Sequence, residues 1–177
     1  MRDNYSADGR EIHEECGVFG VYGVANASNY AYYAIHSLQH RGQQGCGIVT
    51  TGDGKNLKIV KGAGLVHEIF NGENLSALNG NIAIGHVRYP PTNIGGMENI
   101  QPFLFRHNTG DFAIAHNGNI VNAEELRAYL EKRGSLFQTT SDSELFAHLI
   151  KKDSRESDRI YHIKEALNML EGAFSML

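Results

Sequence analysis

The sequence has few cysteines, no excess of basic residues and no long apolar run, and each absence excludes a class of protein. Only Cys16 and Cys46 are cysteines, and their spacing matches no zinc or iron–sulfur pattern. The net charge of −4 and the scattered basic residues exclude a dedicated nucleic-acid binder. No segment approaches the roughly 20 apolar residues of a membrane span, and the polar N-terminus is unlike a signal peptide. We therefore expect a cytoplasmic protein with no nucleic-acid or membrane partner.

Glycine divides the chain into two parts. Of the 20 glycines, 17 lie between Gly17 and Gly118, whereas residues 119–171 contain only Gly134. Glycine favours tight turns and weakens helix interiors. We expect a first part rich in turns and a second part rich in helices, within the length of one domain.

Apolar periodicity predicts the elements of the first part. Two β-branched segments, 46–51 and 57–62, are joined by the turn-forming pair Asp53-Gly54 and predict a β-hairpin. The same patterns predict further strands at 16–23, 81–87, 101–105 and 111–118, a helix from residue 30 to Gly42, short helices around GLVHEIF and NLSAL, and a loop from Arg88 to Asn99.

Two capping boxes predict helix starts in the second part. Asn122 precedes Glu125 by three residues, and Ser141 precedes Glu144 by three, so each pair can satisfy free N–H groups of a first turn. Gly134 is expected to end the first of these helices.

A last helix and a strand are expected at the end of the chain. The helix, residues 158–170, has one apolar face formed by Ile160, Ile163, Leu167 and Leu170. The apolar run after Gly172 is typical of a strand that the terminus cuts short, from which we expect a fragment of a longer protein.

Cys16 is open to two interpretations. A cysteine beside an apolar strand is most often a buried structural thiol. Cys16 follows a polar leader of 15 residues, however, and precedes Gly17, where the missing side chain lets a substrate come close. Cleavage before Cys16 would give the thiol an adjacent α-amine with a pKa of about 7.7–8.0, a suitable base. Cys46 has no such setting and is expected in the core.

Other polar residues also have both structural and functional interpretations. Asn117-Gly118 is typical of a turn, but an amide beside an unhindered N–H also suits an oxyanion hole. Arg88, at a strand end, is either a surface charge or a clamp for a carboxylate. Asp142 either assists the cap at Ser141 or holds a substrate ammonium group. The residues alone leave these alternatives open.

His36 and His40 have the spacing of metal ligands on a predicted helix. No third ligand accompanies them. We therefore expect no metal site in this chain.

The chain contains six short motifs in one order: EECGVFG (14–20), HRGQQGCGI (40–48), GHVRY (85–89), ENIQPF (98–103), AHNGN (115–119) and TTSDSE (139–144). In order and spacing they resemble the glutaminase domain of the amidophosphoribosyltransferase family, from Cys16 to the chain end. HRGQ, NIQPF and SDSE favour this family over the glutaminases of glucosamine-phosphate synthase, glutamate synthase and asparagine synthetase.

The resemblance implies an α+β fold, the four-layer αββα sandwich of antiparallel sheets of N-terminal-nucleophile hydrolases, truncated at its C-terminus. It implies a propeptide, residues 1–15, whose removal makes Cys16 the first residue of a glutaminase domain, residues 16–177. The Cys16 thiolate would attack the side-chain amide of glutamine, release ammonia and form a thioester that water converts to glutamate.

The resemblance also implies a role for each of the other candidates. Asn117 and Gly118 would form the oxyanion hole, Arg88 would bind the α-carboxylate of glutamine, and Asp142 would bind its α-ammonium group.

Further expectations concern the full-length family enzyme. There, ammonia passes to a phosphoribosyltransferase domain, absent from this sequence, and forms phosphoribosylamine from phosphoribosyl pyrophosphate in the first step of de novo purine biosynthesis. Magnesium, an iron–sulfur cluster in some members, and a homo-oligomer are expected only there, and no cofactor is expected in this fragment.

Two departures from the family pattern follow Tyr89. Pro91 occupies the place of a usual threonine, and Asn93 that of a usual glycine. Proline removes a hydroxyl and a backbone donor, and asparagine narrows the allowed backbone conformations, so the loop beside the glutamine pocket is expected to differ. The alternatives are an unprocessed or degenerate domain with a binding or regulatory role, and the glutaminase of a different amidotransferase.

Overall fold

The structure, a computed structural model, describes residues 16–89, 96–106, 110–151 and 159–177. The expected propeptide and the departures at Pro91 and Asn93 lie outside the described residues. The elements follow in the order β1 (Gly17–Tyr22), α1 (Ala27–Ser37), η1 (Gln39–Arg41), β2 (Gly45–Thr51), β3 (Lys58–Gly62), α2 (Val66–Ile69), α3 (Gly72–Ala77), β4 (Ile82–Arg88), η2 (Met97–Asn99), β5 (Phe103–Phe105), β6 (Phe112–Ile114), β7 (His116–Ile120), α4 (Ala123–Glu131), α5 (Ser143–Lys151), α6 (Arg159–Asn168) and β8 (Gly172–Met176).

A four-stranded antiparallel sheet forms the first part, with the strand order β1-β4-β2-β3. The predicted hairpin is confirmed, since β2 and β3 pair directly and the Asp53 carboxylate accepts the N–H groups of Lys55 and Asn56 in the turn. Helix α1 packs against this sheet and buries Ile35 beside Ile48 in one apolar core.

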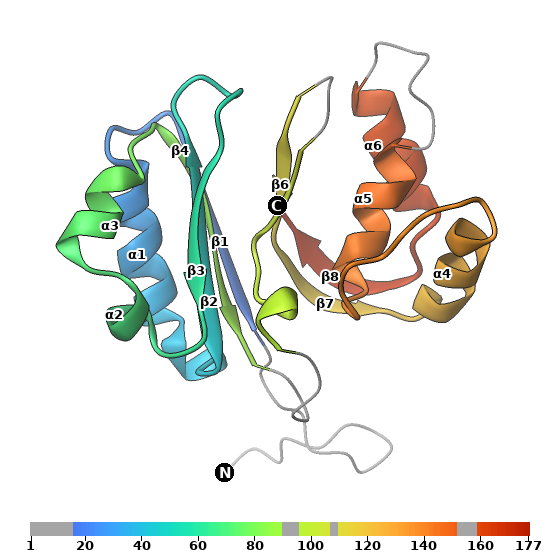
Figure 1. Cartoon of the computed structure of the whole chain (residues 1–177), viewed down its shortest axis with the longest axis horizontal. Helices are drawn as coiled ribbons and strands as arrows, with labels where there is room; N and C mark the ends of the chain where they lie inside the picture. The colour runs from blue at the N-terminus through green and yellow to red at the C-terminus, as the bar shows by residue number, and fades with distance from the viewer. Residues whose placement is uncertain (1–15, 90–95, 107–109, 152–158) are drawn as a thin grey trace.

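Two antiparallel strand pairs, β5-β6 and β7-β8, and three helices form the second part. Its core contains Leu130 of α4 and Leu145 of α5. Figure 1 shows α1, α2 and α3 on one side of the four-stranded sheet, β5 to β8 on its other side, and α4, α5 and α6 beyond those strands. The fold is therefore α+β with antiparallel sheets, as expected.

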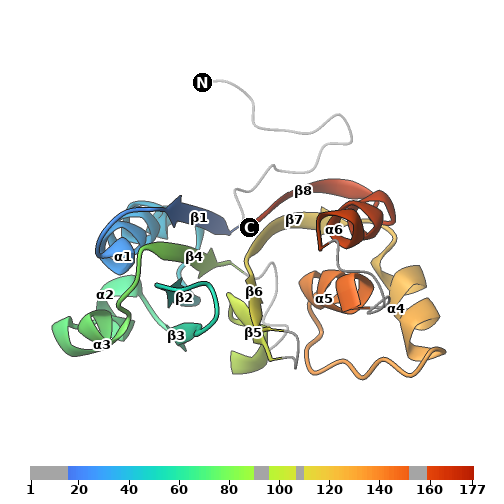
Figure 2. The ribbon, with the colours of Figure 1, turned by 90° about the horizontal axis from the view of Figure 1, so that it is seen from above.

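The two parts meet closely at Gly47 of β2. A Cβ atom there would overlap the carbonyl of Gln101 and the ring of Pro102, so the approach requires glycine. Beside it, the Lys61 ammonium group donates to the Ile100 carbonyl over 2.5 Å. Figure 2 shows the C-terminus between β1 and β7, which are also in contact. The segment from Ile100 to Pro102 is thus fixed against the first sheet.

Asn117-Gly118 does not form the expected turn. The predicted strand 111–118 is instead two strands, β6 and β7, and the pair lies inside β7. Ser175 and Phe174 of β8 are their direct partners and hold them extended. The turn interpretation is therefore wrong, because pairing with a distant strand overrides the local preference.

Helices α4 and α5 are confirmed, but the capping boxes are wrong. The Asn122 side chain makes no capping bond and instead accepts the N–H of Glu171, 49 residues later, over 3.1 Å. The Glu144 carboxylate is buried and accepts the N–H of Thr139 over 2.8 Å rather than reaching back to Ser141. The Asn122 side chain thus stabilises the short connection between α6 and β8, and Glu144 stabilises the loop before α5.

Helix α6 is confirmed, but most of its predicted core face is exposed. Three of the four stripe residues are exposed: Ile160 by 66%, Ile163 by 39% and Leu167 by 37%. The fourth, Leu170, lies just beyond the end of α6 and is buried as expected, and α6 packs against α5 with Ala166 also buried. Helix α1 begins at Ala27, three residues earlier than expected. None of the described helices has the length and apolarity needed to cross a membrane.

Candidate active site

Cys16 precedes β1 in a left-handed backbone conformation, with φ of 55°. This conformation costs an L-residue about 1–2 kcal/mol, so surrounding contacts must maintain it. The partly buried side chain contacts the backbone of Tyr89. The Tyr89 N–H donates to Sγ over 3.4 Å, and the thiol donates to the Tyr89 carbonyl over 3.7 Å. The thiol therefore lies at the end of β4.

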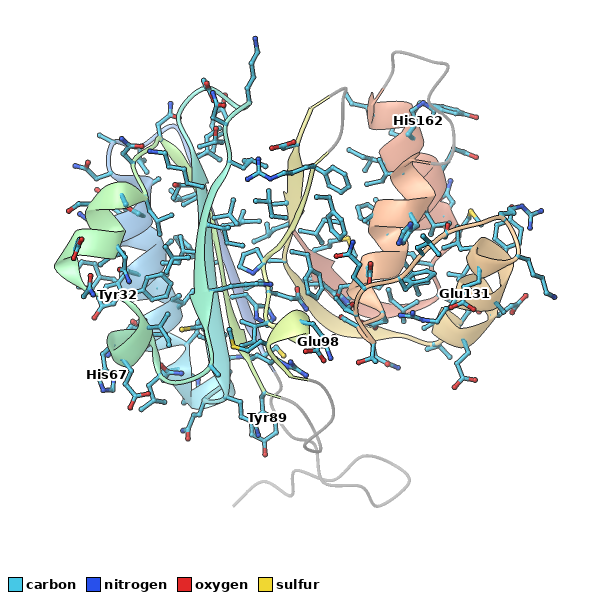
Figure 3. The ribbon with its side chains drawn as sticks, viewed as in Figure 1. Tyr32, His67, Tyr89, Glu98, Glu131 and His162 are labelled. Carbon is cyan, nitrogen blue, oxygen red and sulfur yellow. The ribbon has the colours of Figure 1, made fainter. Side chains whose placement is uncertain are left out.

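Arg88 is the last residue of β4 and stands next to this thiol. Its Nη1 donates to the Gly96 carbonyl over 3.2 Å. Partial burial lowers the pKa of Arg88, whereas the negative charges of the Cys16 thiolate and the Glu98 carboxylate raise it. Figure 3 shows Tyr89 and Glu98 at the same end of the molecule. A guanidinium that remains charged and a thiol thus share one small region.

Arg41 is a site residue that the sequence reasoning missed. Its Nε donates to the Cys16 carbonyl over 2.9 Å and so holds the residue in its unusual conformation. The next residue, Gly42, touches the backbone of Arg88 so closely that any Cβ atom would overlap it. The HRG segment therefore fixes both Cys16 and Arg88. The only sequence signal was its membership of a motif, because an arginine after a helix is otherwise typical of the surface.

On β7, alternate N–H groups point away from β8. Ala115, next to the strand, exchanges two hydrogen bonds with Leu177. Hydrogen-bonded and non-hydrogen-bonded residues alternate along an antiparallel pair. The N–H groups of His116, Gly118 and Ile120 therefore lie on the edge of β7 opposite to β8.

Two of these three donors are bound by side chains. The His116 N–H donates to Oε1 of Gln101 over 2.7 Å, and the Ile120 N–H donates to Oδ2 of Asp142 over 3.1 Å. The Gly118 N–H lies between them on the same edge. This arrangement suits the binding of one oxygen atom at Gly118.

Gly118 and Asn117 match an oxyanion site in two further respects. Gly118 has φ of +141°, and a Cβ atom would overlap the carbonyl of Ala173 and the Cα of Phe174, so only glycine fits. The Asn117 side chain is partly exposed and has no hydrogen-bond partner among the described residues. Its amide can therefore donate to a ligand.

Asp142 directly precedes α5 and is held by β7. Besides Ile120 on Oδ2, its Oδ1 lies 3.4 Å from Ser143 Oγ and 3.6 Å from His116 Nδ1. Burial raises the pKa of the Asp142 carboxyl, but the hydrogen-bonding effect of His116 and the N–H groups of Ile120 and Ser143 lower it by more, so the net shift is downward. Asp142 is therefore an ionised carboxylate at neutral pH, suited to bind a cation.

Side chains from ENIQPF hold the TTSDSE segment. The Asn99 amide donates to Thr140 Oγ1 over 2.8 Å and accepts the Thr140 N–H over 3.2 Å. The Gln101 amide donates to Ser143 Oγ over 3.2 Å. In the sequence, Asn99 and Gln101 stand out only as members of a motif, which predicts no individual role for them. Their contacts pre-organise the segment that presents Asp142.

His86 of β4 is fully buried and lies next to His116. Neither of its ring nitrogens makes a hydrogen bond of ordinary geometry within the described residues. Burial lowers the pKa of His86 to about 3, the backbone of His116 opposes this shift, and the charges of His116 and Arg88 add to it. His86 is therefore neutral and connects the strand of Arg88 to the strand of Asn117.

We expect His86 to make the fold sensitive to acid. Below pH of about 6.5 the unfolded chain takes up a proton at this residue, and the folded protein does not until its pKa of about 3 is approached. The free energy of unfolding should then fall by about 1.4 kcal/mol per pH unit between these values. Glutamine does not titrate, so the free energy of unfolding of H86Q, measured with denaturant, should depend less steeply on pH by this amount. An H86Q slope equal to that of the unsubstituted chain would contradict the prediction.

The structure brings the predicted residues together in two groups. Cys16 and Arg88 form the first, and Asn117, Gly118 and Asp142 form the second; contacts between β1 and β7 and between His86 and His116 join them. The remaining cysteine, Cys46, is buried in the core, and burial, with the charge of Glu68, raises the pKa of its thiol to about 12. Neither cysteine forms a disulfide within the described residues. In the described part of the chain no group of three or more His, Cys, Asp or Glu residues could hold a metal ion.

Comparison with known proteins gives a consistent result. Residues 86–177 match the family model described as a glutamine amidotransferase domain. The chain is 51% identical to amidophosphoribosyltransferase of Bacillus subtilis over 97% of its own length and 36% of that protein. It is 46% identical to the Methanocaldococcus jannaschii protein of the same name, over 92% of this chain and 35% of that one. The chain thus spans about a third of the curated relatives it matches.

Solved structures similar to this chain lead to the same family. Glutamine phosphoribosylpyrophosphate amidotransferase from B. subtilis, complexed with ADP and GMP, superposes with a TM-score of 0.83 and 50% identity, over 90% of this chain and 34% of that chain. A structure described as the allosteric regulatory enzyme of purine biosynthesis gives a TM-score of 0.86 and 51% identity, with the same coverage.

Proposed function

Because this chain belongs to the glutamine amidotransferase domain family, we propose that it hydrolyses the side-chain amide of glutamine to glutamate and ammonia, with Cys16 as the nucleophile. The observation that supports this most is the edge of β7, where the Gly118 N–H and the Asn117 amide are available beside a region that holds a thiol and an arginine. Such donors stabilise the oxyanion of an acyl-transfer reaction.

The reaction begins once residues 1–15 have been removed and Cys16 has a free α-amine. The amine takes the thiol proton, and Sγ attacks the amide carbon of glutamine. Collapse of the tetrahedral intermediate breaks the carbon–nitrogen bond, and the nitrogen leaves as ammonia with the proton from the amine. Water then attacks the thioester, which releases glutamate and restores the thiol.

The other residues either bind the α-groups of glutamine, which do not react, or stabilise the oxyanion that the reaction creates. The Gly118 N–H and the Asn117 amide donate to the oxyanion of both tetrahedral intermediates. The Arg88 guanidinium binds the α-carboxylate of glutamine through charge-assisted hydrogen bonds. The Asp142 carboxylate binds the α-ammonium group. Arg41 holds the Cys16 carbonyl and thereby the direction of the thiol and the amine.

The names of the relatives support a wider proposal. In this proposal the fold is the four-layer αββα sandwich of N-terminal-nucleophile hydrolases. The ammonia is then used to form phosphoribosylamine from phosphoribosyl pyrophosphate in purine biosynthesis. That second reaction requires a phosphoribosyltransferase domain in a longer, homo-oligomeric protein, which would also supply the ligands for magnesium or an iron–sulfur cluster. No step proposed for this chain uses a metal.

Intact-mass measurement combined with an assay of glutamate release tests the proposal. We expect a chain that begins at Cys16 and that releases one glutamate and one ammonia per glutamine. A chain that begins at Cys16 but releases no glutamate at saturating glutamine would refute the enzymatic function. A chain that retains residues 1–15 and binds glutamine without hydrolysis would favour the binding or regulatory alternative.

A further inference from the structure

Ser143 is the centre of a buried hydrogen-bond network beneath Asp142. It is the first residue of α5 and is fully buried. Four polar atoms surround its hydroxyl oxygen: His116 Nδ1 at 2.8 Å, Ser141 Oγ at 3.1 Å, Gln101 Nε2 at 3.2 Å and Asp142 Oδ1 at 3.4 Å. A serine hydroxyl has one proton and two lone pairs, so these contacts compete.

The orientation of Gln101 fixes the first of these bonds. Its Oε1 accepts the backbone N–H of His116, which identifies the oxygen of the amide. Nε2 therefore faces Ser143 and donates to its oxygen. One lone pair of Ser143 is filled in this way, and its proton remains available for either His116 Nδ1 or Asp142 Oδ1.

The charge of Asp142 decides between these two acceptors. Its Oδ1 lies 3.6 Å from His116 Nδ1, and a carboxylate at this distance favours a proton on Nδ1 over a lone pair. The Nδ1–H then donates to Ser143 Oγ and fills the second lone pair. The hydroxyl proton is left for Asp142 Oδ1.

We propose that Ser143 and His116 are positioning residues that orient the Asp142 carboxylate toward the α-ammonium group of glutamine. Ser143 holds Oδ1 and the Ile120 N–H holds Oδ2, so neither oxygen can rotate away, and each retains a lone pair for the ligand. This inference rests on the proposed function. It adds that selectivity for an α-amino acid depends on a buried hydroxyl that does not touch the substrate.

The protonation of His116 tests the network without any reference to activity. Nitrogen-15 NMR of the full chain, with labelled histidine and H116Q to assign the signal, should show a neutral His116 ring protonated at Nδ1. A ring protonated at Nε2 instead would require Ser143 to donate to Nδ1, would leave no proton for Asp142, and would overturn the proposal.

The kinetics of S143A test the effect on selectivity. Loss of one charge-assisted hydrogen bond should raise KM for glutamine about 10-fold and leave kcat within about 2-fold. Inhibition by glutaramate, which is glutamine without its α-amino group, should not change. Equal weakening of glutamine and glutaramate would indicate a merely structural role and refute the proposal, as would an unchanged KM.

S141A is the matched control. Ser141 accepts the backbone N–H of Ser143 and touches the same hydroxyl, but within the described residues its side chain makes no hydrogen bond to the Asp142 carboxylate. Its replacement should leave the ratio of glutamine to glutaramate affinity unchanged, and a shift in this ratio equal to that of S143A would contradict the assignment. A ring protonated at Nδ1 in a chain that hydrolyses no glutamine would refute the proposed function and leave the hydrogen-bond network intact.

Discussion

Replacing Cys16 with alanine is expected to abolish glutamate release, with a loss of at least about 10⁴-fold in turnover, as for removal of other catalytic nucleophiles. The same change should also prevent removal of residues 1–15, since the thiol would attack the Glu15 carbonyl and form a thioester that water cleaves. The purified C16A chain should therefore keep the full mass of 177 residues. Intact-mass spectrometry and a coupled glutamate assay measure both effects.

Cys46→Ala is the matched control for the loss of a thiol. Cys46 is fully buried, and its raised pKa keeps it protonated, so the C46A chain should lose some stability but should still process and hydrolyse. If C16A still lost its leader, self-cleavage would be wrong. If C16A hydrolysed glutamine at the original rate, Cys16 would not be the nucleophile.

Replacing Asn117 with alanine should lower kcat by about 10²–10³-fold, the usual cost of removing one oxyanion donor. KM should change little, because the amide donates to the oxygen mainly in the tetrahedral intermediate. Stability should stay within about 0.5 kcal/mol, since this side chain makes no hydrogen bond within the described residues. Steady-state kinetics and denaturant unfolding together separate the two effects.

Asn119→Ala provides the comparison within the same strand. Asn119 is exposed, lies two residues further along β7 and belongs to the same motif, but no oxyanion role is assigned to it. N119A should hydrolyse glutamine at the original rate. An N117A turnover equal to that of N119A would remove Asn117 from the oxyanion site.

Local patterns predicted the elements of the first part well. The pair Asp53-Gly54 located the turn of one hairpin, and apolar alternation located β1 and β4 within one or two residues. Cys16 and Arg88 were then recognisable as candidates because each stands at a strand end. In these segments the local preference and the tertiary structure agree.

The errors arose where distant residues decide the structure. Asn117-Gly118 has the composition of a turn, but β8, nearly 60 residues later, holds it in a strand. Glu144 has the spacing of a capping residue, yet it stabilises the preceding loop through Thr139. No spacing within a single segment could show that Arg41 binds the Cys16 carbonyl. Such contacts depend on the packed fold and not on sequence neighbours.

The edge of β7 also limits what a ligand can place there. Alternate N–H groups along a strand lie about 7 Å apart, and the outer two of the three are bound by Gln101 and Asp142. A ligand therefore meets a single backbone donor, at Gly118, on an otherwise saturated edge. An extended peptide cannot pair with this edge of β7, since such pairing would need all three N–H donors. The same side chains that order the site thus exclude extended polypeptides and admit one small carbonyl group.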